Sequence, residues 1–464
     1  MTTAAHQPDH HQPAGVTRAL ASFTSGLRYE HLPPATVDMT KRLLLDGIGC
    51  LLAGTQAADG RNASAMVRRL GGSAQATLFT DLEPASVRDA AFVNGICLYS
   101  VGLNDIHKPA GAHPGGSIIP VVLAVGEWQR SSGAALLAAM AAGYEVIGRV
   151  GSAVYPSHRE RGFHPTGTCG TFGAAAAAGS LLAFDAQAMA SAFGIAGSQA
   201  AGLYECHHDG TSTMIFHAGR AAQNGVEAAL LIEAGFTGPA TVLEGSKGFF
   251  QATADRYDAA EAMRDLGQRF EIDATSFRPY FGCNSTLAAS GVTAQILDEL
   301  KGLSPHDVQE VVVYCNSVPA HDNADPDPRT LLAARLSLPF NIALVLVKRA
   351  VLSTDLDEVT LCDASIRDLL PRIRIVADDQ MARYGARLRL RTKDGRTAER
   401  VILDPRGSED NPLLWDDVAE KFRRLVQPFM PAAKARRVIE AVANLDSTDV
   451  AGLVATLRDA MPTR

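Results

Sequence analysis

The sequence predicts a mainly α-helical protein: a large all-α domain formed by both chain ends, and a smaller inserted α+β lid domain. Three observations support this fold class. At 464 residues, the chain is too long for one small core. Apolar residues recur at helical spacing from residue 16 to about residue 263, with little β-branched alternation. Strand-like alternation begins near residue 270 and gives way to helical spacing after residue 407.

Residues 16–268 and 407–464 are expected to form the helical domain, behind a disordered polar tail at residues 1–15. Two helices are predicted within residues 16–56, where a proline pair precedes the second helix and Gly54 ends it. The many Ala and Gly residues would let the helices approach closely. Further helices are expected to begin near Pro84 and Pro120 and to cover Ala174–Phe184, Ala186–Ala201, Ala218–Ala234 and Ser246–Ala254.

Residues 269–406 are expected to form the lid domain, with a mainly antiparallel sheet. Three segments alternate as strands do, and the last of them contains a Lys-Asp-Gly hairpin signal. The strands are expected within 308–316, 370–378 and 386–403, and helices between them within 287–300 and 339–350.

The composition argues against two kinds of binding partner, nucleic acid and membrane. The chain is 47% apolar and 20% charged, and its formal charge of −7 gives no basic footprint for nucleic acid. No continuous apolar run reaches the roughly 20 residues of a membrane span, and the N-terminus lacks a signal-peptide pattern. The seven cysteines are scattered, odd in number and never spaced C-x-x-C, which favours a reducing cytoplasm over a disulfide framework. We therefore expect a cytoplasmic protein that binds neither nucleic acid nor membrane.

Ionisable residues gather in one loop, residues 104–114, which leads directly into an apolar helical run. Asp105, His107, Lys108 and His113 lie among prolines and glycines, so the segment is a loop rather than a helix. The same device recurs fifty residues later, where His164 and a proline precede a small-residue helix. Charged groups on a rigid loop at a helix entrance suit an anionic substrate.

Cofactor signatures are missing. The sequence has no GxxxxGK[ST], no HExxH and no GxSxG, and its Gly-rich fragments follow no predicted strand. The groups His207-His208-Asp209 and Asp105-x-His107 lack convincing partners for a metal. We therefore expect no cofactor and no metal, which leaves acid–base chemistry by side chains.

His113 and His164 are the strongest acid–base candidates, because an imidazole titrates near neutral pH. The alternative is that each only caps its helix. Asp105 could orient a histidine or act as a base itself, unless it simply caps the loop. For substrate carboxylates we expect Arg278 and Lys108, with His107 in the same loop; a solvated surface charge is the alternative. Tyr144 could donate to an oxyanion or be a packed core tyrosine.

Several segments together resemble the MmgE/PrpD family, and the resemblance covers nearly the whole chain. They are FVNGICLYSVGLNDIHKPAGAHPGGSIIPVVLAVGE, GYEVIGRVG, RGFHPTGTCGTFGAAAAAG, HAGRAAQNG and FRPYFGCNST. The resemblance implies a helical domain with a lid, a homodimer, and a cofactor-free site in the interdomain cleft for di- or tricarboxylates. On the family pattern, His113, His164, Asp105 and Arg278 match site residues.

The chain departs from the decarboxylase-like branch of this family at several site positions. Gly102 stands where that branch has an aspartate, Met214 replaces a lysine, and Cys283 stands at a lid histidine. We count Met214 and Cys283 as substrate-binding positions. Loss of the lysine and the aspartate removes groups for polyanion binding and proton transfer, which argues against cis-aconitate decarboxylation and, less strongly, against 2-methylcitrate dehydration. Replacement of the lysine by methionine is expected to make the pocket less cationic, which favours a smaller or less charged substrate.

The expected activity is removal of a proton α to a carboxylate or imine of a small di- or tricarboxylate. Our main interpretation is an epimerase or isomerase resembling iminodisuccinate epimerase. The alternative is a lyase, either a dehydratase or a decarboxylase of the 2-methylcitrate or cis-aconitate type. A non-catalytic carboxylate-binding homologue is the alternative from another class.

Overall fold

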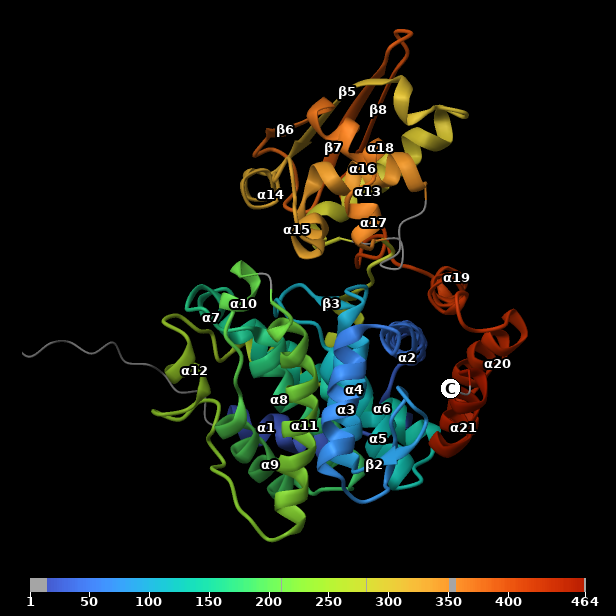
Figure 1. Cartoon of the computed structure of the whole chain (residues 1–464). Coiled ribbons are helices and arrows are strands. Elements are labelled where there is room, and N and C mark those ends of the chain that lie inside the picture. The colour runs from blue at the N-terminus through green and yellow to red at the C-terminus, as the bar shows by residue number, and fades with distance from the viewer. Residues whose placement is uncertain (1–14, 210, 281, 350–355, 463–464) are drawn as a thin grey trace, which may run out of the picture.

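The large and small domains of the chain lie one above the other (Figure 1). A computed structural model describes residues 15–209, 211–280, 282–349 and 356–462. The predicted tail lies outside these residues except for Gly15. Helices dominate, and a four-stranded sheet is confined to the small domain, so the predicted mainly α fold class is confirmed.

Both ends of the chain contribute to the core of the large domain, because residues 16–277 and 413–461 supply one cluster of buried apolar side chains. Helices α20 and α21 run along the flank of the domain (Figure 1). The helices of the large domain are α1 (Val16–Gly26), α2 (Pro34–Gly54), α3 (Ala58–Leu70), α4 (Val87–Ser100), α5 (Gly115–Trp128), α6 (Gly133–Val154), α7 (Ser157–Glu160), α8 (Pro165–Leu181), α9 (Ala186–Gln199), α10 (Glu205–His208), α11 (Thr213–Glu233), α12 (Phe249–Thr253), α19 (Trp415–Val426), α20 (Ala432–Ala443) and α21 (Val450–Ala460).

Some helices of the large domain begin at residues whose side chains satisfy free backbone N–H groups. The Ser86 side chain accepts from the Asp89 N–H at the start of α4, and Ser132 accepts from Ala135 at the start of α6. Helix α8 begins with a proline directly after His164, as its sequence predicts. These starts fix where the side chains before each helix lie.

Helices α6, α8 and α11 pack backbone against backbone. A Cβ added at Gly173 would lie 2.8 Å from the Gly143 carbonyl oxygen, and one added at Gly225 would lie 2.3 Å from the Ala174 Cβ. No side chain larger than hydrogen fits at these contacts without moving a helix. The Ala- and Gly-rich sequence of α8 is therefore a requirement of its close packing.

Helix α6 is long and apolar enough to cross a membrane by length and composition alone. However, 89% of its most apolar window is buried inside the protein. Packing in the core of the large domain accounts for the apolar surface of α6.

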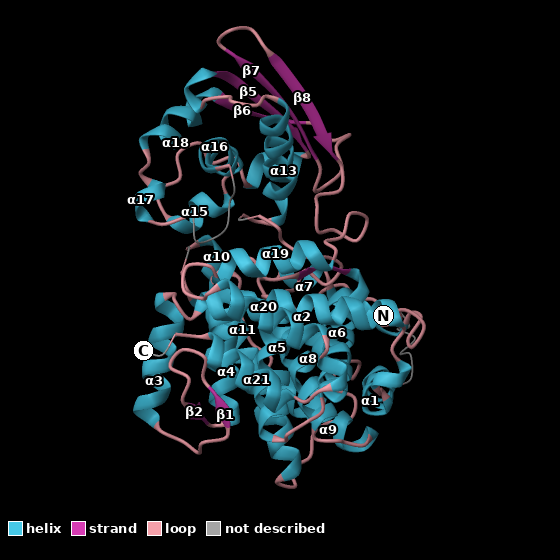
Figure 2. Cartoon of the chain, turned by 90° about the vertical axis from the view of Figure 1, so that its right-hand side faces the viewer, coloured by secondary structure: helices cyan, strands magenta, loops and turns pink. Residues whose placement is uncertain are grey.

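The small domain is a four-stranded sheet with helices packed on it (Figure 2). Strand order is β6-β5-β7-β8, with β5–β6 parallel and the other two pairs antiparallel. Alternating burial along β7 shows that one face is covered, and α13 and α16 lie against it. The elements are α13 (Asn284–Glu299), β5 (Val308–Cys315), α14 (Ser317–Asp322), α15 (Leu331–Leu336), α16 (Leu338–Lys348), α17 (Glu358–Leu361), α18 (Ala364–Leu369), β6 (Ile373–Ala377), β7 (Ala386–Thr392) and β8 (Thr397–Ile402).

A short antiparallel pair joins the central loop to the segment that leads into the small domain. Strand β3 (Ile106–His107) pairs with β4 (Thr275–Ser276), and Ile106 lies opposite Ser276. Strand β3 lies at the end of the large domain that faces the small one (Figure 1). The pairing places Arg278 beside the loop that carries Asp105 and His113.

Candidate active site

His113 lies just before α5, and the backbone holds its ring. Its Nδ1 is 2.5 Å from the carbonyl oxygen of Asp105. Because a carbonyl oxygen only accepts, Nδ1 carries the hydrogen and Nε2 is left with its lone pair. Nη2 of Arg278 also lies 3.0 Å from this Nδ1, as a cation near the ring rather than a donor to it. Burial and then this guanidinium hold the pKa of His113 well below its usual value, so the ring is neutral.

The side chain of Asp105 secures the start of α5. Both of its carboxylate oxygens lie 3.1 Å from the Gly115 N–H, and the Tyr144 hydroxyl donates to Oδ2 at 2.7 Å. Burial raises the pKa of Asp105 to about 6, although these hydrogen bonds oppose the rise. The Asp105 side chain thus caps the start of α5, as in the capping alternative, while its main-chain carbonyl holds His113.

His164 is the residue immediately before α8 and is 3% exposed. Its Nδ1 lies 3.0 Å from Nδ1 of His217 on α11. Burial, followed by the neighbouring His217 and by the cation of Arg159, holds the pKa of His164 well below its usual value. The Tyr204 ring packs edge-on against His164 at 5.6 Å.

Tyr99 brings the two predicted histidines into one site. Its ring meets that of His113 edge-to-face at 5.5 Å and that of His164 at 6.3 Å. The backbone N–H of His113 also donates to the hydroxyl of Thr166, two residues after His164, at 3.0 Å. The two imidazoles thus lie around one buried tyrosine, as the shared sequence context of their helix starts suggested.

Two guanidinium groups approach the site from the segments that follow β4. Arg278, 3% exposed, donates from Nε to the Asn104 carbonyl at 2.7 Å. Arg335 on α15 donates from Nη2 to the Gly102 carbonyl at 3.0 Å. Within the described part of the chain, neither arginine has a carboxylate in ion-pair contact. The site is therefore cationic, although Met214 replaces the expected lysine.

Three residues that we expected in the site have other partners. Nε2 of His107 pairs with the buried carboxylate of Glu271 at 3.0 Å. The ammonium of Lys108 lies 5.2 Å from the centre of the Tyr384 ring, between the two domains. The Tyr144 hydroxyl is committed to Asp105, so it is not free to donate to an oxyanion. His107 belongs to β3, whereas Lys108 follows the strand.

Cys283 lies among the residues that surround the arginines, and its thiol accepts from Asn323 at 3.5 Å. Met214 is half-buried on α11, three residues before His217. Sequence analysis missed Tyr99, Tyr204, His217 and Arg335. His217 could have been found, since it stands in the quoted HAGRAAQNG segment; nothing in the sequence around Arg335 separates it from a surface arginine.

Among the residues that the structure describes, no three His, Cys, Asp or Glu side chains are grouped so that they could hold a metal ion.

This fold and this site define a class of protein. Its members are mainly helical, carry a small sheet-containing domain, and have one histidine close to the start of each of two helices. Sequence models of the MmgE/PrpD N-terminal and C-terminal domains match residues 18–262 and 283–447. The chain belongs to the MmgE/PrpD family.

Curated relatives match almost from end to end. The cis-aconitate decarboxylase-like protein oryM of Aspergillus oryzae is 27% identical, over 95% of this chain and 97% of the relative. The human cis-aconitate decarboxylase is 26% identical, over 95% of this chain and 94% of its own. That of Aspergillus terreus is 25% identical, over 97% of both chains. These relatives are enzymes named for a lyase reaction, so they favour our lyase alternative over the epimerase.

Proposed function

We propose that this protein is a cofactor-independent lyase acting on a small polycarboxylate, with decarboxylation of cis-aconitate as the leading candidate reaction. The observation that carries the proposal is the contact of two neutral imidazoles with Tyr99, beside the guanidinium of Arg278, which has no carboxylate in ion-pair contact among the described residues. The relatives named as cis-aconitate decarboxylases support the choice of reaction.

Arg278 is suited to bind one substrate carboxylate. Asn104 occupies its Nε and part of Nη2, and Nη1 has no acceptor among the described residues. A buried guanidinium without an anion is unfavourable, so a carboxylate that reaches Nη1 gains a charge-assisted hydrogen bond. Such a carboxylate would lie next to the ring of His113.

Decarboxylation of cis-aconitate consumes one proton and releases one carbon dioxide. The bond between the departing carboxylate and its methylene carbon breaks, and its electron pair forms a double bond to the central carbon. The electron pair of the original double bond then binds a proton at the carbon of that bond that is not the central one. The product is methylenesuccinate.

We assign proton delivery to Nε2 of His113. Its Nδ1–H is held by the Asp105 carbonyl, so Nε2 is the atom that can gain and lose a proton. In the free protein, burial and then the Arg278 cation hold the pKa of His113 well below its usual value. A bound carboxylate would neutralise Arg278 and let His113 take up the proton that the reaction needs. His164, whose ring also contacts Tyr99, would then face the same substrate as a second acid–base group.

The test is incubation of the purified protein with cis-aconitate in D₂O, followed by proton NMR and by carbon dioxide release. We expect methylenesuccinate with one deuterium at the newly protonated carbon. Gain or loss of water would indicate a dehydratase instead. Exchange of an α-proton of an imino or amino dicarboxylate, without loss of any group, would support the epimerase. A protein that binds these acids without turnover or exchange would be a carboxylate binder, and the proposal would be wrong.

A further inference from the structure

We propose that Arg335 is a second carboxylate-binding residue of this site, and that it restricts the site to substrates with at least two carboxylates. The inference rests on the proposed function only for the position of the substrate beside His113. The residue comes from the small domain, on α15, which faces the large domain (Figure 1).

The guanidinium of Arg335 lies flat against Gly102. A Cβ added at Gly102 would be 2.1 Å from Cζ of Arg335 and 2.2 Å from each of Nη1 and Nη2. Gly102 also has φ +67°, a conformation that other residues rarely adopt. Any side chain at this position would displace the guanidinium, so Gly102 provides the space that Arg335 occupies.

Arg335 is half-buried, and none of the described carboxylates is in ion-pair contact with it. Its removal from water, followed by the like charge of Arg278, lowers the pKa of Arg335 to about 10, against the effects of Tyr99 and Cys283. An anion beside the two guanidinium groups would offset the repulsion between them. Within the described residues, the only hydrogen bond that the Arg335 side chain makes is the one to the Gly102 carbonyl.

The two arginines are bonded to residues that lie two positions apart in one loop. Arg278 is bonded to Asn104 and Arg335 to Gly102, so both guanidinium groups are fixed by the same backbone segment. One small molecule with two carboxylates can neutralise both. A monocarboxylate would leave one cation unpaired, so the pair discriminates by the number of carboxylates.

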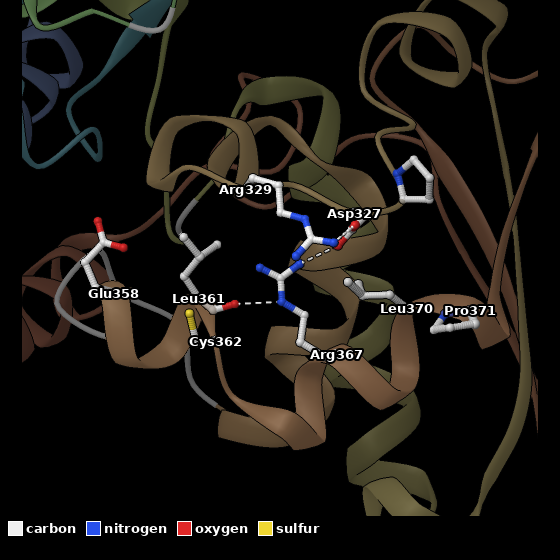
Figure 3. A pocket seen from close by; sticks show the side chains of 9 residues that line it. Asp327, Arg329, Glu358, Leu361, Cys362, Arg367, Leu370 and Pro371 are labelled. Carbon is white, nitrogen blue, oxygen red and sulfur yellow. Dashed lines mark hydrogen bonds and ion pairs between the residues drawn. The ribbon is translucent and has the colours of Figure 1, made fainter.

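Another pair of arginines in the small domain serves as a contrast. Arg329 and Arg367 line an open hollow of about 540 Å³ that also contains the exposed Cys362 (Figure 3). Both pair with Asp327, Arg367 at 2.9 Å, and Arg367 also donates to the Leu361 carbonyl. Both guanidinium groups are in ion-pair contact with this carboxylate, and that of Arg329 is also in contact with water, so this hollow has a weaker demand for an anion. Arg329, whose side chain is 77% exposed, is a matched control six residues before Arg335.

The experiment is calorimetric titration of the full chain with tricarballylate, succinate and propionate, which carry three, two and one carboxylates and contain no double bond to react. For Arg335→Gln we expect a loss of about tenfold to a hundredfold in affinity for the first two ligands, the usual range for one charge-assisted hydrogen bond. Propionate binding should stay within about twofold, and Arg335→Lys should fall between Gln and wild type. Arg329→Gln should bind all three as the wild type does.

Gly102→Ala should reproduce the loss, because its methyl group displaces the guanidinium. The double variant Gly102→Ala/Arg335→Gln should then lose no more than either single variant. Thermal melts of each variant check that the fold is retained. Additive losses would show that Gly102 acts through something other than Arg335.

Three results would overturn the role of Arg335: unchanged tricarballylate binding by Arg335→Gln, an equal loss for all three ligands, or no binding of either polycarboxylate by the wild type. The reaction is tested separately. A wild type that binds tricarballylate but releases no carbon dioxide from cis-aconitate would refute the proposed reaction and leave this role standing. If the wild type turns over cis-aconitate and the Arg335→Gln variant binds tricarballylate with full affinity, only the role of Arg335 is refuted.

Discussion

Nδ1 of His164 and Nδ1 of His217 face each other across 3.0 Å in the buried part of the site. Only one of the two nitrogens can carry the hydrogen, so each ring fixes the tautomer of the other. His217 therefore positions His164, and the proton on the outward Nε2 of His164 depends on it.

Removing His217 should impair turnover without unfolding the protein. For His217→Ala we expect kcat to fall on the order of 10²-fold, because the His164 ring loses its orientation. His217→Asn, whose amide can replace the Nδ1 contact, should recover most of the loss. The measurement is the pH profile of kcat, with His321→Ala as the control because His321 is 90% exposed. Equal kcat and identical pH profiles in His217→Ala and wild type would contradict this role.

His113 should be essential for proton transfer. We expect His113→Ala to lower kcat by roughly 10²–10⁴-fold, the usual contribution of a general acid or base. Circular dichroism should show a retained fold, because His113 is only partly buried. Steady-state rates with cis-aconitate measure the effect; turnover within twofold of wild type would remove His113 from the mechanism.

Binding of a polycarboxylate should draw a proton onto His113. In the free protein, burial and Arg278 hold the pKa of His113 below its usual value, so the ring is neutral near pH 6.5. A carboxylate on Arg278 removes the second of these causes and raises that pKa, which means net proton uptake on binding. Titrations with tricarballylate in buffers of different ionisation enthalpy count the protons taken up. The uptake should disappear in His113→Gln; proton release in the wild type would show that the coupling has the opposite sign.

Asp105 should make the protein less stable as the pH rises. Its pKa is about 6 in the folded protein against 3.8 in the unfolded chain, so the folded state holds the proton more tightly. The stability that this group contributes is present at low pH and is lost between about pH 4 and pH 6. At about 1.4 kcal/mol per pKa unit, the change is about 3 kcal/mol.

Asp105→Asn cannot titrate, so it isolates this effect. The unfolding free energy of the variant, relative to wild type, should increase by that amount between pH 4 and pH 7. Denaturant unfolding at several pH values measures it. A difference between the two proteins that does not vary with pH would contradict the raised pKa.

The buried pair Lys421–Asp46 should be important for stability. Nζ of Lys421, on α19, lies 2.5 Å from Asp46 on α2 and also donates to the Leu103 carbonyl at 2.6 Å. Lys421→Met leaves the Asp46 carboxylate buried without a partner, which should cost about 3–5 kcal/mol. Urea unfolding measures this loss. The double variant Asp46→Asn/Lys421→Met should recover part of it, and Lys301→Met, at an exposed position, should change little.

The periodicity of the chain was enough to predict its fold class and the convergence of its two histidines. Helical spacing is a local property, and His113 and His164 stand in similar contexts at two helix starts. The same logic failed for Lys108 and His107, because their directions depend on the pairing of β3 with a segment about 170 residues away. Local sequence does not contain that partner.

The sequence did not reveal every charged group of the site. Replacement of a lysine by Met214 suggested a less charged pocket, but Arg335 adds a guanidinium from a distant segment. Its contact with Gly102 joins residues 233 positions apart. Gly102 was recognised as a departure, yet a glycine in a loop does not indicate which side chain fills the space beside it.

The backbone-to-backbone packing of α8 limits where this protein can evolve a new substrate preference. Because Gly143 and Gly173 touch without intervening side chains, an added carbon at either position would shift the helix and carry His164 with it. Arg335 and Cys283 lie on the small domain, outside that tight stack. Laboratory selection for altered substrate range should therefore accumulate changes in the small domain and leave the glycines of the large one untouched.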